Sequence, residues 1–155
     1  MYRFSDNNAN NDIGLHDCRA TEFWYDDSTL TFVFDEGFCV LADNRYNDLK
    51  KNAYTGRAEL EFKASYKDIE TNMTVYIFTD TEDKNKSIRE RISLEQFRDM
   101  INSGAELEFL YSYKGYMTYL FECWLWCDTT PHTKECMIII SADEVTYKWN
   151  ELLPE

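Results

Sequence analysis

The strongest constraint on the fold is a period-two alternation of apolar and polar residues. In residues 57–64, RAELEFKA, the apolar positions Ala58, Leu60 and Phe62 alternate with charged ones. Residues 29–34, TLTFVF, repeat the pattern. Successive side chains of a strand point to opposite faces, so this alternation predicts half-buried strands of an antiparallel sheet.

Two further segments extend the predicted sheet. Residues 105–113, AELEFLYSY, alternate so that one face is expected to carry Leu107, Phe109, Tyr111 and Tyr113, opposite Glu106 and Glu108. Residues 73–78 and 136–140, MTVYIF and CMIII, are apolar on both faces, which is typical of central strands.

One segment carries the signals of a helix. In residues 91–104, RISLEQFRDMINSG, Ser93 followed by Gln96 forms a capping-box pattern. Ile92 and Phe97 have the spacing of a hydrophobic staple, and Gly104 is a typical stop. We therefore predict a helix over residues 94–102 that covers a sheet face.

Together these patterns predict an α+β, mainly β fold. We expect a twisted antiparallel sheet, sandwich-like or barrel-like, with about nine to ten strands and one helix at 94–102. The Asn/Asp-rich stretch at 5–12 predicts a flexible N-terminal segment at 1–12. Residues 13–155 are expected to form a single antiparallel β domain.

The charge restricts the kinds of partner. With 29 acidic and 16 basic side chains the formal net charge is −13, which disfavours binding to nucleic acid or to an anionic membrane surface. The chain shows neither a signal-peptide pattern nor a run of about 18 apolar residues. Its five cysteines indicate reduced thiols and a cytoplasmic location. The expected partner is another protein of basic character.

A cluster of cysteines at 123–136, CWLWCDTTPHTKEC, resembles metal-ligand spacing. On a strand, however, Cys123 and Cys127 would stand about 13 Å apart, whereas two thiolates on one zinc lie about 3.8 Å apart. We therefore expect no metal and no cofactor. A weaker alternative places Cys127 opposite Cys136 across the loop at 128–135, with His132 above them.

A second cysteine–histidine pair lies at 15–18, LHDC. If this segment is a strand, His16 and Cys18 share a face but stand about 6.6 Å apart, too far for a direct hydrogen bond. We therefore predict no catalytic residue, and an enzyme is the third hypothesis.

Acidic pairs and aromatic residues supply the candidate binding positions. Glu59 and Glu61 lie on one predicted strand, and Glu106 and Glu108 on another; if these strands are neighbours, the four acids form one anionic patch. The aromatic candidates are Tyr111, Tyr113, Tyr116, Trp124 and Trp126. Tyr and Trp are common in interfaces as well as in cores, so both alternatives stay open for the two tryptophans.

Our first functional hypothesis is a non-enzymatic acidic protein that binds another protein, in the manner of an inhibitor or immunity protein. The alternative is a small-ligand-binding β domain with an aromatic-lined cavity.

Overall fold

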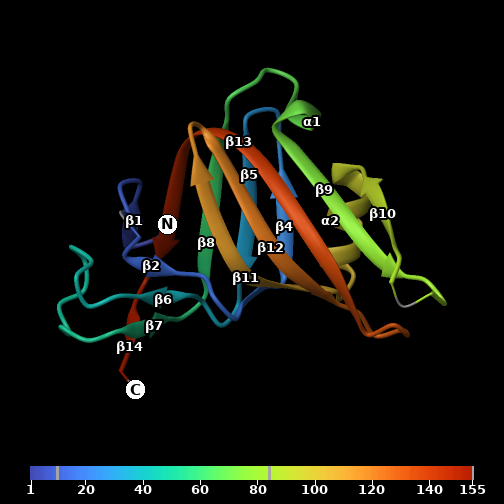
Figure 1. Cartoon of the computed structure of the whole chain (residues 1–155). Coiled ribbons are helices and arrows are strands. Elements are labelled where there is room, and N and C mark those ends of the chain that lie inside the picture. The colour runs from blue at the N-terminus through green and yellow to red at the C-terminus, as the bar shows by residue number, and fades with distance from the viewer. Residues whose placement is uncertain (10, 84, 155) are drawn as a thin grey trace.

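The computed structural model describes residues 1–9, 11–83 and 85–154. Over these residues the chain forms fourteen strands and two helices (Figure 1). The strands are β1 (Phe4–Asp6), β2 (Ile13–Gly14), β3 (Cys18–Ala20), β4 (Glu22–Tyr25), β5 (Thr29–Phe34), β6 (Cys39–Val40), β7 (Ala53–Thr55), β8 (Ala58–Ala64), β9 (Met73–Asp80), β10 (Ser87–Ile92), β11 (Glu106–Gly115), β12 (Thr118–Trp126), β13 (Thr133–Trp149) and β14 (Leu152–Leu153). The helices are α1 (Ile69–Asn72) and α2 (Leu94–Asn102).

Ten of the strands form one large antiparallel sheet, which confirms the predicted mainly β fold. Its main path runs β3-β11-β12-β13-β8-β5-β4, while β9 and β1 also pair with β13 and β10 pairs with β9. The sheet is strongly twisted but does not close into a barrel (Figure 1). A second, four-stranded sheet has the order β14-β7-β6-β2. The described chain therefore has more strands than expected, and α1 adds a second, four-residue helix.

Strand β13 organises the large sheet because it changes partners along its length. Its first half lies between β12 and β9, and its second half between β8 and β1. The change coincides with a register shift between Ala142 and Glu144, a β-bulge at Asp143. A bulge bends its strand and increases the local twist. As a result, one strand is shared by two differently oriented parts of the sheet.

The core lies on the inner face of the large sheet, where phenylalanines from several strands meet. Phe32 makes edge-to-face ring contacts with Phe62, Phe97 and Phe109, at centroid distances of 5.5 to 6.4 Å. All four side chains are fully buried. Aromatic pairs in this geometry add about 0.5–1.5 kcal/mol each beyond the area they bury.

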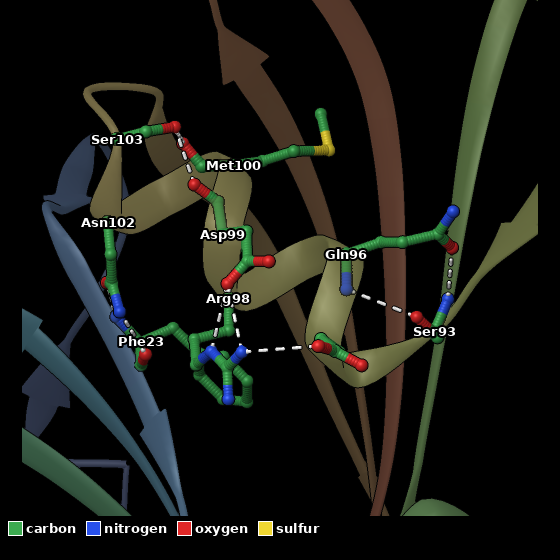
Figure 2. Close-up of polar contacts among 9 residues, drawn as sticks. Phe23, Ser93, Gln96, Arg98, Asp99, Met100, Asn102 and Ser103 are labelled. Carbon is green, nitrogen blue, oxygen red and sulfur yellow. Dashed lines mark hydrogen bonds and ion pairs between the residues drawn. The ribbon is translucent and has the colours of Figure 1, made fainter.

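Helix α2 closes one side of this core and has the predicted bounds. The Ser93 hydroxyl accepts a hydrogen bond from the Gln96 amide at 3.1 Å, and the Gln96 side chain accepts one from the Ser93 amide at 2.9 Å (Figure 2). At the other end, the Asn102 side chain exchanges two hydrogen bonds with the backbone of Phe23 in β4. The predicted capping box is therefore confirmed, and Asn102 attaches the helix to the sheet.

Part of the segment at 1–12, for which flexibility was predicted, pairs with the large sheet. Residues 4–6 form β1 and pair with β13, while Asn10 lies outside the described residues. The carboxylate of Asp6 is buried and accepts hydrogen bonds from Arg45 at 2.7 Å and Asn44 at 3.0 Å. These long-range contacts fix β1 against the rest of the fold.

A second bulge, at Leu110 in β11, overturns the face predicted for two tyrosines. Phe109 pairs with Cys123 in β12, but Tyr111 pairs with Glu122, so Leu110 is an extra residue. Beyond this point the alternation is reversed: Tyr111 and Tyr113 point to the exposed face. A strict period of two cannot survive an inserted residue, and the sequence carries no glycine that marks the insertion.

Candidate functional site

The side of the large sheet that points away from the core forms a continuous surface across six strands, β3, β11, β12, β13, β9 and β10. We call this surface the outer face. Directly paired residues share a face, so the register defines its rows. One row is Arg19, Glu108, Trp124, Glu135, Phe78 and Arg89. The next row is Tyr111, Glu122, Met137, Tyr76 and Arg91.

A third row adds Tyr113, Leu120 and Ile139 to the outer face. The apolar members of these rows are half-buried or exposed, and in the described structure neither a helix nor a second sheet packs over them. At about 4.8 Å per strand, six strands span about 24 Å. Charged side chains share the first two rows with the apolar ones: Arg19, Glu108, Glu135 and Arg89 in the first row, and Glu122 and Arg91 in the second.

The tryptophans on the outer face are held in place by polar contacts. The Trp126 indole N–H donates a hydrogen bond to Glu108 at 2.6 Å, and the Arg19 guanidinium lies 4.5 Å from the Trp126 ring centroid. Arg19 also pairs with Glu106 at 3.0 Å. Trp124 packs edge-to-face against Trp126 and stays 45% exposed. The ring of Trp124 therefore packs on a neighbour that is itself hydrogen-bonded, and it presents an accessible apolar surface.

Glu108 is not the solvated acid that the alternation predicted. Its side chain is only 9% exposed, because Trp126 and Trp124 cover it. The carboxylate therefore positions the tryptophan cluster, whereas Glu106 at the rim is partly exposed.

Two acids missed by the sequence analysis complete the outer face. Glu122 and Glu135 are exposed and have no ion-pair partner among the described residues. Glu135 lies between Trp124 and Phe78, which also line a hollow of about 410 Å³ on this surface. No local signal marks these two acids, because strand pairing decides what surrounds them.

The two strands that carry the four predicted acids are not neighbours, so the four acids do not form one patch. Two strands, β12 and β13, separate β8 from β11, so Glu59 and Glu61 are remote from Glu106 and Glu108. Glu61 pairs with Lys148 at 2.7 Å. Burial, together with the nearby Glu59 carboxylate, raises the pKa of Tyr2 to about 12. Glu61 therefore interacts with Lys148 and Glu59 with Tyr2, and neither acid belongs to a patch with Glu106 and Glu108.

The tyrosines fall into two groups. Tyr111 and Tyr113 are more than half exposed on the outer face. Tyr116 is 91% exposed in the turn between β11 and β12, so it extends the same aromatic region beyond the sheet.

The weaker metal alternative assumed a strand register that differs from the one observed. Cys123, not Cys127, lies opposite Cys136, and both paired side chains are buried. His132 is exposed, with its Nδ1 3.2 Å from the Cys127 carbonyl oxygen. Within residues 1–9, 11–83 and 85–154, no group of three or more His, Cys, Asp or Glu side chains is placed to hold a metal ion.

The second cysteine–histidine pair lies at a turn rather than on one strand face. His16 is exposed, and its Nδ1 lies 2.6 Å from the Leu110 carbonyl oxygen. Cys18 is buried, and its thiol donates to the carbonyls of Gly14 and His16 at 3.7 Å. Burial raises the pKa of Cys18 to about 11. The two side chains therefore do not share a face, contrary to expectation.

A separate cavity of about 360 Å³ opens on the inner face, between the N-terminal segment and strands β8, β11, β12 and β13. We call it the inner cavity. Its walls include Phe62, Tyr119, Phe121 and Tyr147. Such a volume lies within the usual range of small-ligand sites.

Comparison with protein-family models, curated proteins and solved structures gave no match to this chain. None of the described helices is long and apolar enough to cross a membrane. The functional argument therefore rests on the geometry of the outer face and of the inner cavity.

Proposed function

We propose that this chain is a non-enzymatic interaction protein that binds a basic partner protein through the outer face. The observation that carries the proposal is the continuous, uncovered surface of aromatic and apolar side chains around the unpaired carboxylates of Glu122 and Glu135. Interfaces are enriched in aromatic anchors surrounded by a polar rim.

The chemistry of this surface suits an Arg or Lys side chain. A guanidinium stacked on exposed Trp124 would also reach the Glu135 carboxylate, which combines a cation–π contact with a charge-assisted hydrogen bond. Arg19 over the Trp126 ring is the same arrangement within the chain. The net charge of −13 would accelerate the encounter with a basic partner.

The enzymatic alternative gains no support from the two histidines. Both are exposed and lie beside a backbone carbonyl. His16 also lies 3.5 Å from the exposed carboxylate of Asp17, but among the described residues neither histidine ring contacts a cysteine thiol. We propose a cytoplasmic location, supported by the five cysteines, which form no disulfide.

The proposal is tested by association kinetics with a partner recovered from the protein's own cells. Reversal of the two unpaired outer-face carboxylates, Glu122→Lys with Glu135→Lys, should slow association about tenfold and make it less dependent on salt. Asp27→Lys with Glu36→Lys is the matched control, because it makes the same net-charge change at exposed turns. If the two double variants slow association equally, the effect comes from net charge alone. That result would contradict binding through the outer face.

The inner cavity supports a second candidate function, the binding of a small ligand. The specific observation is a 360 Å³ space with aromatic walls and several polar groups at its mouth. This combination is typical of small-molecule sites.

A further inference from the structure

The inner cavity is shaped by the two bulges of the large sheet. The bulge in β11 turns Ser112 and Lys114 toward the inner face, in register with Phe121 and Tyr119. The bulge in β13 does the same for Tyr147, and Asp143, the bulged residue itself, lines the cavity. Both irregularities therefore bring side chains to one space that regular strands would place elsewhere.

Aromatic rings make up the deep wall of this cavity. The Phe62 ring packs edge-to-face against Tyr119 and Phe121, at centroid distances of 5.5 and 5.9 Å. Burial raises the pKa of Tyr147, and the nearby Tyr119 and Asp12 add to the shift, so this phenol stays neutral at physiological pH. A wall of neutral aromatic rings favours apolar groups and cations over anions.

Acidic groups outnumber basic ones around the cavity. Asp143 and Glu144 line it from β13, and Lys114 is the basic side chain among its described lining residues. Neither acid has an ion-pair partner among the described residues, although Asn7 lies within 3.5 Å of Glu144. Close by, one carboxylate oxygen of Asp12 is buried without a hydrogen-bond partner. The local charge therefore favours a positively charged guest.

The chain already places one cation against this wall. The Lys114 ammonium lies 5.7 Å from the centroid of the Tyr119 ring. Lys114 is exposed near the end of the β11–β12 hairpin, so its long side chain can move out to solvent. A ligand ammonium could take the place of the lysine ammonium.

We propose that the inner cavity binds an organic cation with an apolar body, namely a primary amine on an aromatic or branched aliphatic skeleton. The ammonium lies between Asp143 and Glu144, and the apolar body rests against Phe62, Phe121 and Tyr119. This assignment rests on the small-ligand function given above as the second candidate, and it is independent of the outer face.

Three probes of similar size and different charge test the assignment: phenethylamine, 2-phenylethanol and 3-phenylpropanoate, each titrated into the full chain by calorimetry and two-dimensional NMR. Phenethylamine should saturate at millimolar or lower concentration, bind at least about tenfold more tightly than the other two, and shift the signals of residues around the cavity. No saturation by any probe would overturn both the cation assignment and the small-ligand function. Tighter binding of the alcohol or the acid would overturn the cation assignment alone.

Charge variants then locate the effect. Asp143→Asn with Glu144→Gln should weaken phenethylamine binding about tenfold, whereas Asp27→Asn with Glu36→Gln, an equal charge change at exposed turns outside the cavity lining, should not. Lys114→Met should strengthen it, because the competing ammonium is removed from the Tyr119 ring. The proposed site would be contradicted if the two double variants weakened phenethylamine binding equally. Weaker phenethylamine binding by Lys114→Met would contradict it as well.

Discussion

At the residue scale, the hydrogen bond between Trp126 and Glu108 links stability to the outer face. The carboxylate is almost fully buried, and the indole N–H is its close neutral donor, at 2.6 Å. We predict that Trp126→Phe lowers the free energy of unfolding by about 1–3 kcal/mol, because a buried acceptor loses its partner. Urea unfolding measures this effect.

Trp124→Phe is the matched control for that prediction. The Trp124 indole N–H has no hydrogen-bond partner among the described residues, and its ring is 45% exposed. Trp124→Phe should therefore lower the free energy of unfolding clearly less than Trp126→Phe does. An equal loss from both variants would mean that ring packing, rather than the bond to Glu108, stabilises this cluster.

The thiols give a second prediction at the residue scale. Burial raises the pKa of Cys136 to about 12 and that of Cys123 well above its usual range, so both are protonated and protected at pH 8. Cys127 is only half-buried. A disulfide reagent should therefore modify Cys127 before Cys123 and Cys136, and peptide mass spectrometry can locate the modified thiol. Modification of Cys136 in the folded chain at the rate of Cys127 would contradict the observed packing.

At the element scale, the contrast between α2 and β11 explains how much of the fold was predictable. The helix has local signals at both ends, and the structure has it at Leu94–Asn102 as expected. Strand β11 was also predicted, but its bulge was not, since a bulge depends on the pairing with β12. That pairing also decides that Tyr111 and Tyr113 lie exposed on the outer face.

The acids show the same limit on prediction. The sequence identifies Glu106 and Glu108 as members of one strand, but only the strand order separates them from Glu59 and Glu61. Glu122 lies on β12 and Glu135 on its neighbour β13, and only the register between these two strands makes both acids part of one surface. Contacts between distant parts of a chain leave no local pattern.

Two glycines provide a prediction about the turns. Both have positive φ, +73° at Gly37 and +119° at Gly104. A Cβ at Gly37 would overlap Thr55 and the Gly56 carbonyl, whereas one at Gly104 meets no atom within 4 Å. Gly104→Ala should cost about 1 kcal/mol of unfolding free energy, and Gly37→Ala about 2 kcal/mol more, because overlap adds to backbone strain. Equal costs in thermal unfolding would contradict the packing of β7 against this turn.

At the scale of the whole molecule, the carboxylate of Glu22 makes the stability of the fold depend on pH. Hydrogen bonds from Arg57 and then Trp24 hold the pKa of Glu22 below its usual 4.5. The folded state therefore binds fewer protons than the unfolded state, and the stability from Glu22 is present above pH 4.5 and lost as pH falls through the folded value. Glu22→Gln should flatten the acid-side decline of the midpoint of thermal unfolding, whereas Glu36→Gln is the control. An unchanged slope in the Glu22 variant would contradict the contribution of the Arg57 pair.

The distribution of surfaces is the second property of the whole molecule. The inner face is filled by phenylalanines and closed by α2, apart from the inner cavity at its other end. The outer face has comparable aromatic character but no cover within the described chain. The proposed partner protein would cover this face.

The most direct measurement of that claim places a photocrosslinking amino acid at position 124 and, in a second variant, at position 36, each expressed in the protein's own cells. We predict an adduct with one basic protein from position 124 and none from position 36, with loss of the adduct on Glu135→Lys. No adduct from position 124, or the same adduct from both positions, would contradict binding through the outer face.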